Sequence, residues 1–197
     1  MPVEGAVQLT NEGSKVLGWH TEHAGMSVQP QWLAFAGLRS DPKKQALTAF
    51  SDIRDAISLL DASTLESLYD EEYLTTVPIK LQRKGATNEL RHAILSGPRD
   101  VPELRAALYG DLTKGLTQRA TLAINKLRSA LQGCGETLLQ DAGSLIIVNN
   151  RLQAHARASD FETTGLGDDR WFQRLHVAAT LWDLREHQRD NRRVFAF

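Results

Sequence analysis

Two short segments, far apart in the chain, carry side chains that could hold one metal ion. His20 and Glu22 are separated by a single residue, and His155 lies in the second segment. If the backbone is extended through residues 15–22, alternate side chains leave the same face, so His20 and Glu22 can bind one ion together. His155, from another strand, would supply a third ligand. Two imidazoles and one carboxylate on one face of Fe(II) leave its remaining positions open for substrates.

The histidine and glutamate are not specific by themselves, because a His-x-Glu triplet occurs by chance in many chains. A histidine near a strand end is more often a surface or packed residue than a ligand. The same three ligands could also hold zinc in a hydrolase or isomerase that needs no dioxygen. His23 would leave the opposite face from His20 and Glu22, so we interpret it as a surface residue or a neighbour of the ligands.

A strand predicted at residues 170–179 carries two arginines on one of its alternating faces. That face holds Arg170, Phe172, Arg174 and His176. The pattern alone does not decide whether it points inward, and most arginines are solvated. If it does point inward, a buried guanidinium requires an anion, because an unpaired buried charge costs several kcal/mol. A dicarboxylate cosubstrate would satisfy it in the bidentate geometry that arginine favours.

Composition limits the classes of function and partner. The chain has 197 residues, 42% of them hydrophobic, which is enough for one domain with a real core. Its formal net charge of -1 offers no basic field for nucleic acid or anionic lipid. The single cysteine, Cys134, excludes an internal disulfide and suits a reducing cytoplasm. No apolar run is long enough to span a membrane, so we expect a cytoplasmic protein with a small-molecule substrate.

The periodicity of the sequence predicts short strands with a few helices between them. A hairpin is expected from residues 6–9 and 15–20, and another from 137–139 and 145–148 around the turn at Asp141. Further strands are expected at residues 32–38 and 46–50. Helices are expected after Asp52, from Ser63 by a capping box, and over residues 116–131, where Gly133 would end the last one. Residues 76–111 are broken by prolines and glycines into the loops that often line a pocket.

The chain resembles the clavaminate synthase-like branch of the Fe(II)/2-oxoglutarate-dependent oxygenases, which are related to TauD-type enzymes. His20, Glu22, Pro30 and Trp32 look like the first metal motif of that family and the strand after it. Residues 145–157, with His155, look like the second metal motif. Asp169, Arg170, Trp171 and Arg174 look like its cosubstrate motif. Several motifs agreeing in order make this a specific signal.

The resemblance implies both a site and a fold. By position, His20, Glu22 and His155 match the iron ligands, and no catalytic residue is implied beyond them. Arg170 and Thr48 match residues that bind 2-oxoglutarate, and Arg174 is a candidate second contact. The implied fold is mostly β with flanking helices, a double-stranded β-helix or jelly-roll barrel.

The implied function is hydroxylation of an unactivated carbon of an amino acid, or of an amino-acid-derived intermediate in antibiotic biosynthesis. It uses Fe(II), 2-oxoglutarate and O2 and releases succinate and carbon dioxide. Desaturation or cyclisation at the same site, and a catalytically impaired module that still binds iron and 2-oxoglutarate, remain alternatives. The prime substrate and the oligomeric state are not indicated.

Some positions depart from the family pattern. Gly25 stands where phenylalanine is usual, Gln29 where arginine is usual, and Ala107 where an aspartate that recognises basic substrates is common. Only nineteen residues precede His20, so the expected organisation is a single oxygenase domain over residues 1–197 that is short at its N-terminus. Substrate contacts are expected from residues 76–111 and from around Arg157.

Overall fold

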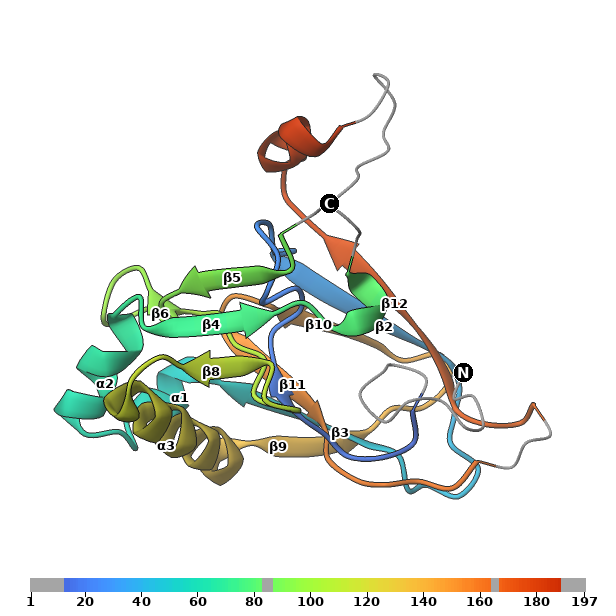
Figure 1. The fold of residues 1–197 in the computed structure, drawn as a ribbon. Coiled ribbons are helices and arrows are strands. Elements are labelled where there is room, and N and C mark those ends of the chain that lie inside the picture. The colour runs from blue at the N-terminus through green and yellow to red at the C-terminus, as the bar shows by residue number, and fades with distance from the viewer. Residues whose placement is uncertain (1–12, 83–86, 164–166, 189–197) are drawn as a thin grey trace.

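The computed structural model describes residues 13–82, 87–163 and 167–188. Within these residues the chain is mostly β, with three α-helices and two short 3-10 helices (Figure 1). This matches the secondary-structure content expected from the sequence. In the part of the chain that is described, no helix combines the length and the apolar character needed to cross a membrane.

Two antiparallel sheets face each other and carry most of the metal-site residues. The first sheet has the order β1 (Leu17–His20), β11 (Gln153–Arg157), β3 (Leu47–Asp52), β9 (Glu136–Leu139). The second has the order β10 (Leu145–Asn149), β2 (Trp32–Arg39), β12 (Trp171–Val177). Phe35 joins the two sheets, because its ring lies 6.2 Å from that of Phe50 on β3 and 5.6 Å from that of His155 on β11.

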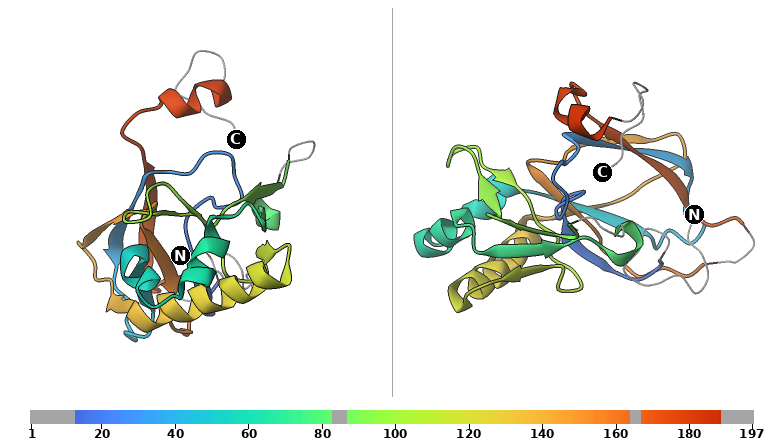
Figure 2. Two further views of the ribbon diagram at one scale, coloured as in Figure 1. Left: turned by 90° about the vertical axis from the view of Figure 1, so that its left-hand side faces the viewer. Right: turned by 45° about the horizontal axis from the view of Figure 1, so that its top comes forward.

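A third region combines short strands with the helices. Its sheet has the order β5 (Glu89–His92), β4 (Tyr73–Thr76), β8 (Thr113–Gly115), and β6 (Leu95–Ser96) pairs with β7 (Glu103–Leu104). The α-helices α1 (Ile53–Ile57), α2 (Ala62–Tyr69) and α3 (Gln118–Cys134) gather at one end of the molecule, on the left in Figure 1. The 3-10 helices are η1 (Ile79–Leu81) and η2 (Trp182–His187), and η2 stands apart from the sheets in the left-hand view of Figure 2.

The core is divided between the helices and the sheets. The larger cluster lies under α3, whose buried residues Ala123, Ile124, Leu127 and Leu131 repeat at helical spacing. A smaller cluster of Leu33, Phe35 and Val148 lies on the second sheet. The strands that carry the candidate histidine ligands are therefore packed against the core on one face.

The three predicted helices are present, but two of their ends differ from expectation. The side chain that caps α2 is Asp61 rather than Ser63, because the Asp61 carboxylate accepts from the backbone N–H of Thr64 at 2.8 Å. Helix α3 passes Gly133 and ends at Cys134. Gly135 follows, and a Cβ there would lie 2.7 Å from the Trp19 indole, so the close approach of strand β1 requires glycine at this position.

One predicted hairpin is wrong. Strand β9 pairs with β3 in the first sheet, whereas β10 pairs with β2 in the second. The turn at Asp141 therefore carries the chain from one sheet to the other instead of folding it back on itself. In the other predicted hairpin, residues 6–9 lie outside the described residues, and the second strand is β1.

Candidate metal centre

His20 and His155 are direct partners across two neighbouring strands. They pair in the antiparallel register of β1 and β11, with an irregularity between Leu17 and His20. Their ring centroids lie 4.1 Å apart and both side chains are buried. The other edge of β1 is covered by the chain near Ala107, which forms an isolated bridge with His20. Backbone pairing on both sides therefore fixes the position of the first imidazole.

Glu22 lies beside the two histidines, but a turn positions it and not the strand that was expected. Strand β1 ends at His20, and Glu22 lies in the turn that follows. Its backbone N–H donates to Asn150 Oδ1 at 2.7 Å, and its carbonyl accepts from Asn150 Nδ2 at 3.2 Å and from Gln29 Nε2 at 3.0 Å. The expectation that strand alternation places the carboxylate is wrong, because side-chain amides hold this turn instead.

The three predicted ligands converge. His20, Glu22 and His155 each offer one ligand atom, and these atoms all lie within 4.8 Å of one another. Both ring nitrogens of His155 are buried without a hydrogen-bond partner in the described structure. A buried polar atom without a partner costs about 1–3 kcal/mol, so this imidazole needs a ligand that the protein does not supply.

His20 has the tautomer that metal binding requires. His20 Nδ1 lies 2.9 Å from the carbonyl of Gly18, which can only accept. The proton is therefore on Nδ1, and Nε2 keeps its lone pair. Burial lowers the pKa of His20 to about 4, and burial also lowers the pKa of His155 well below its usual value. Both imidazoles are neutral at pH 7, which suits them as metal ligands.

Arg174 forms an ion pair with the candidate carboxylate ligand. Its Nη1 donates to Oε2 of Glu22, although the sequence pattern suggested only a contact with a cosubstrate. Burial raises the pKa of Glu22, and the positive charge of Arg174 opposes that shift. The arginine therefore helps to keep a buried carboxyl group ionised.

Arg170 is buried among aromatic rings. The sequence pattern did not decide the direction of the strand face that carries Arg170, and in the structure this face points inward. Its guanidinium carbon lies 4.5 Å from the Phe172 ring centroid and 5.1 Å from that of Phe161. Its Nη1 donates to the carbonyl of Ala46 at 3.3 Å, and no carboxylate of the described residues lies within salt-bridge distance. Burial lowers the pKa of Arg170 to about 10. This guanidinium is in the environment that favours a bound anion.

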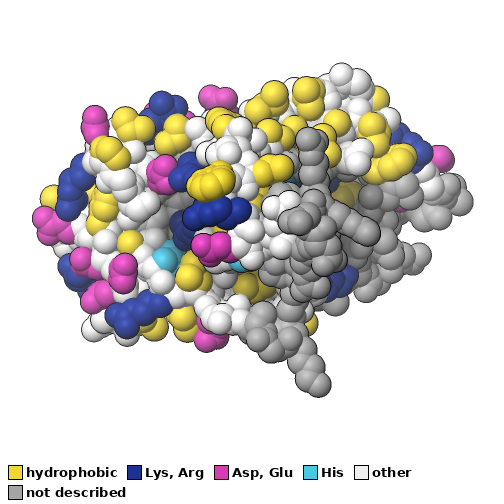
Figure 3. Space-filling model, turned by 90° about the horizontal axis from the view of Figure 1, so that it is seen from above, with side chains coloured by type: hydrophobic (Ala, Val, Ile, Leu, Met, Phe, Trp, Pro, Cys, Tyr) yellow, Lys and Arg dark blue, Asp and Glu magenta, His cyan; other side chains and the backbone are white. Residues whose placement is uncertain are grey.

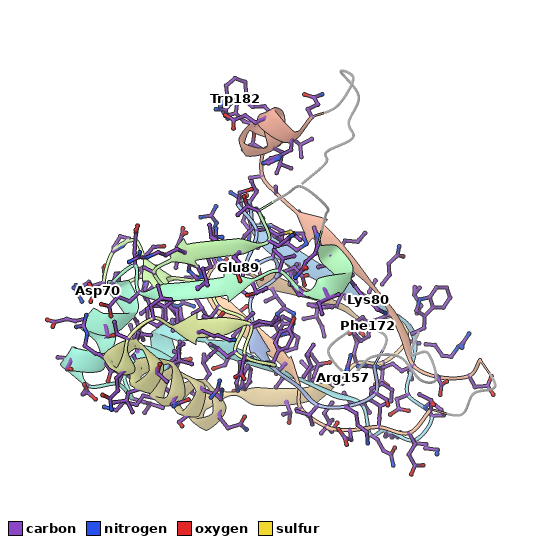
Figure 4. The ribbon with its side chains drawn as sticks, in the orientation of Figure 1. Asp70, Lys80, Glu89, Arg157, Phe172 and Trp182 are labelled. Atoms are coloured by element: carbon purple, nitrogen blue, oxygen red, sulfur yellow. The ribbon has the colours of Figure 1, made fainter. Side chains whose placement is uncertain are left out.

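Thr48, the third residue predicted to contact the cosubstrate, lies on the first sheet beside Arg157. Thr48 on β3 is buried and is the register partner of Arg157 on β11. Arg157 is also buried, and its guanidinium carbon lies 5.8 Å from the Phe161 ring centroid, on the same aromatic residue that Arg170 contacts. Figure 4 labels Arg157 and Phe172 among the side chains at the ends of the strands. Arg157 does not line the cavity described next, and a substrate contact around it stays a prediction.

A cavity of about 460 Å³ opens beside the metal-site residues. His20, Glu22 and Arg174 form part of its wall, and Ala107 and Tyr109 lie next to them. Its outer wall comes from Thr76 and the η1 segment, so the expectation that residues 76–111 line a pocket is confirmed for these positions. The Tyr109 ring packs edge-on against His20 at 5.0 Å, and burial raises the pKa of Tyr109 to about 12. Nothing in the sequence pattern singled out this tyrosine.

His23 does not lie on the opposite side from the ligands, and that prediction is wrong. Its backbone has a positive φ of 60°, which turns its ring back toward Glu22, with 3.9 Å between His23 Nε2 and Glu22 Oε1. The His176 ring lies 4.6 Å from that of His23. Alternation along an extended strand does not apply to a residue in a turn.

The chain was compared with known proteins. No protein-family model matches it. L-asparagine oxygenase of Streptomyces coelicolor is 33% identical over 182 residues, which is 92% of this chain and 54% of the relative. Clavaminate synthase 2 of Streptomyces clavuligerus is 27% identical over 89% of this chain and 54% of the relative. L-lysine 3-hydroxylase of Catenulispora acidiphila is 28% identical over 86% of this chain and 48% of the relative.

Solved structures have the same fold. A structure of asparagine oxygenase in complex with Fe(II), 2S,3S-3-hydroxyasparagine and succinate matches with a TM-score of 0.89 and 32% identity. The match covers 96% of this chain and 59% of the asparagine oxygenase chain. The non-haem iron oxygenase OrfP matches with a TM-score of 0.81 at 22% identity, over 99% of this chain and 60% of that chain, which supports the fold alone.

These comparisons confirm the resemblance seen in the sequence. By their names, the relatives are an L-asparagine oxygenase, an L-lysine 3-hydroxylase and a clavaminate synthase, and the chain spans about half of their length. The alignments and the fold therefore agree on one group of homologues.

Proposed function

Starting from this homology to clavaminate synthase-like non-haem iron oxygenases, we propose that the chain is the oxygenase domain of an Fe(II)- and 2-oxoglutarate-dependent dioxygenase. It hydroxylates an unactivated carbon of an amino acid, free or within a natural-product intermediate, and releases succinate and carbon dioxide. The observation that carries the proposal is the buried group of two imidazoles and one carboxylate, in which His155 has no protein partner. That group fits the two-histidine, one-carboxylate site of Fe(II) oxygenases.

The fold and the domain organisation belong to the same proposal. We expect the two facing sheets to be parts of a double-stranded β-helix, and residues 1–197 to form one domain. The support is the high TM-score with asparagine oxygenase and the Phe35 contacts that join the sheets.

Three residues are proposed to hold the metal. His20 and His155 are fixed by the pairing of β1 with β11, and Glu22 by its hydrogen bonds to Asn150. Iron at this site, with 2-oxoglutarate and dioxygen, supplies the oxidation that inserts one oxygen atom into a carbon–hydrogen bond. The protein contributes neutral imidazoles, an ionised carboxylate and a position fixed before the metal arrives.

The cosubstrate is proposed to lie between the metal site and Arg170. A buried guanidinium without a carboxylate partner is suited to the distal carboxylate of 2-oxoglutarate, which it can grip through two parallel hydrogen bonds. Thr48 on the facing strand would add a hydroxyl group to the same carboxylate. Arg174 is retained as a second contact, and it would have to share its charge between Glu22 and the ligand.

The charge of the cavity indicates the class of prime substrate. Among the described residues, Arg174 and Lys80 are the basic residues of its wall, and Glu22, a proposed metal ligand, is the acidic one. Ala107 occupies the position where an aspartate would recognise a basic side chain. A second cation in the substrate would therefore meet no free counter-charge, so we expect a neutral or acidic amino acid rather than lysine or arginine.

Anaerobic reconstitution followed by turnover tests the proposed function. Fe(II) and then 2-oxoglutarate should produce the visible charge-transfer absorption of the chelate, and a panel of amino acids should then be screened for stimulated succinate release. A zinc hydrolase or isomerase would give no absorption, and that result would contradict the proposal. Absorption without succinate for any amino acid would indicate the binding module, and desaturated or cyclised products would indicate a desaturase or cyclase.

A further inference from the structure

A second group of metal-ligating side chains lies on the other side of Glu22. Glu22, His23 and His176 each offer one ligand atom, and these atoms lie within 4.8 Å of one another. His23 Nε2 is 3.9 Å and His176 Nε2 is 4.0 Å from the same oxygen, Oε1 of Glu22. We call these three residues the second cluster.

Two independent backbone features bring the imidazoles to this oxygen. His23 has a positive φ of 60°, a conformation that most side chains avoid and that places its ring beside Glu22. His176 lies two residues after Arg174 on β12, so both side chains leave the same face of the strand and both contact Glu22. The rings of His23 and His176 meet edge to face at 85°.

The two oxygens of Glu22 have different neighbours. Arg174 contacts Oε2, whereas both imidazoles face Oε1. Arg174 therefore pairs with the oxygen that the second cluster does not use and leaves Oε1 to the two imidazoles.

The second cluster is open to solvent, unlike the first group of ligands. His23 and His176 line a second cavity of about 470 Å³, formed by residues 27–31, the strand end at Leu104 and the chain leading into η2. His23 also lines the first cavity. The side chain of His176 is 37% exposed, whereas His20 and His155 are buried. On the face drawn in Figure 3, histidine side chains are visible between charged and hydrophobic groups.

We propose that Glu22, His23 and His176 form a second binding site for a divalent transition metal, zinc being the best match, which shares Glu22 with the proposed iron site. Two imidazoles, one carboxylate and a water molecule complete the tetrahedral set that Zn²⁺ prefers. With bonds of about 2.0–2.1 Å the ligand atoms would be roughly 3.3 Å apart, so the two rings must move inward by about half an ångström. His176, at the exposed end of β12, can make that movement.

Sharing one carboxylate makes the two sites compete. A cation at the second cluster withdraws negative charge from Glu22 and repels a second cation nearby, which weakens metal binding at His20 and His155. Zinc at the second cluster therefore acts as an inhibitor of iron loading. This role depends on the proposed function, but the binding of zinc does not.

Zinc titration of the metal-free protein by calorimetry tests the second site. The variant with His20→Ala and His155→Ala, which lacks the first site, should still bind one zinc ion per chain. Adding His176→Gln or His23→Gln to it should weaken that binding at least tenfold, whereas adding His187→Gln, outside both groups, should not. Circular dichroism checks that each variant is folded, and using both single additions guards against one variant that fails to fold.

The outcomes separate the two proposals. No zinc binding by the folded His20→Ala, His155→Ala variant, or unchanged binding after His176→Gln and His23→Gln, overturns the second site. Zinc also competes directly for the first site, so the test compares two proteins: zinc should weaken Co(II) binding at the first site, followed by its visible absorption, at least tenfold more in the wild type than in His176→Gln. Failure to form the 2-oxoglutarate chelate with Fe(II) would contradict the proposed function and leave the zinc result intact.

Discussion

Asn150 holds the backbone of Glu22 at both of its polar groups. The amide oxygen of Asn150 accepts from the N–H of Glu22 at 2.7 Å, and its amide nitrogen donates to the carbonyl of Glu22 at 3.2 Å. The same nitrogen also donates to the carbonyl of Pro30 at 3.0 Å, and Asn150 is fully buried. One side chain thus connects the turn after β10 to the segment that carries the carboxylate.

The first prediction follows from this connection. Asn150→Ala should lower the affinity for Fe(II) or Co(II) about tenfold or more, as outer contacts of metal ligands typically do, because Glu22 loses its fixed position. The variant should also lose about 1–3 kcal/mol of unfolding free energy, since buried backbone groups lose their partners. Metal titration and urea unfolding measure the two effects. Asn149→Ala is the matched control, because the side-chain oxygen of Asn149 accepts from the nearby N–H of Arg151 and not from the segment that carries Glu22. An equal loss of affinity in that control would contradict the assignment.

The second prediction concerns the unpaired imidazole. His155→Leu should abolish metal binding at the first site and make the metal-free protein more stable by about 1–3 kcal/mol, because it removes two buried nitrogens without partners. Urea unfolding in the presence of a chelator gives the comparison. A metal-free variant that is less stable than the wild type would mean that His155 has a structural role in this site.

The third prediction tests the buried guanidinium. Arg170→Leu should leave Fe(II) binding unchanged and weaken 2-oxoglutarate more than tenfold, since a charge-assisted hydrogen bond is worth about 1.5–3 kcal/mol. Titration of the Fe(II) protein with 2-oxoglutarate, followed by its absorption, measures this. Arg157→Leu, which removes the neighbouring buried guanidinium on β11, is a useful comparison, and unchanged affinity after Arg170→Leu would place the cosubstrate elsewhere.

The fourth prediction is a dependence of stability on pH. Burial lowers the pKa of His20 to about 4 and that of His155 well below 6.5. The unfolded chain takes up protons at these residues below about pH 6.5 and the folded chain does not, so the free energy of unfolding should fall as the pH decreases from 6.5 toward 4. Each imidazole contributes a slope of about 1.4 kcal/mol per pH unit at most. Glu22 acts in the opposite direction, because its raised pKa adds stability at acid pH that is lost as the pH rises through that pKa.

Two buried imidazoles outweigh one carboxyl group in this range, so the net change should be a loss of stability on acidification. Urea unfolding of the metal-free protein at pH 7 and pH 5 measures it. His155→Leu should have a shallower dependence than the wild type, and identical slopes for the two proteins would show that burial does not control the titration of His155.

Residue type and spacing, together with the family resemblance of the surrounding segments, identified the metal-site candidates. His20, Glu22 and His155 were selected from the sequence, and the structure places their ligand atoms together. Metal binding at these residues stays a prediction. The strands β2 and β3 and the helix α3 were also predicted, because their apolar residues follow the periodicity of a buried strand or helix.

The rest depended on contacts that a local pattern does not contain. The pairing of β9 with β3 and of β10 with β2 is set by packing between sheets, so two strands joined by a good turn were wrongly predicted as a hairpin. Glu22 was expected on a strand and lies in a turn, and its partner Asn150 is 128 residues away. His23 was misplaced for the same reason, since its orientation comes from one positive φ angle.

The strand that carries His20 stops before Glu22, and this makes the three ligands unequal. Exchanging either histidine disturbs a residue within the β1–β11 ladder, whereas shortening the side chain at position 22 leaves every backbone hydrogen bond of that turn in place. The guanidinium of Arg174 would then face an emptied position with no negative charge beside it. Position 22 is consequently the point at which an engineer could admit an external anion, such as azide or formate, without rebuilding the scaffold.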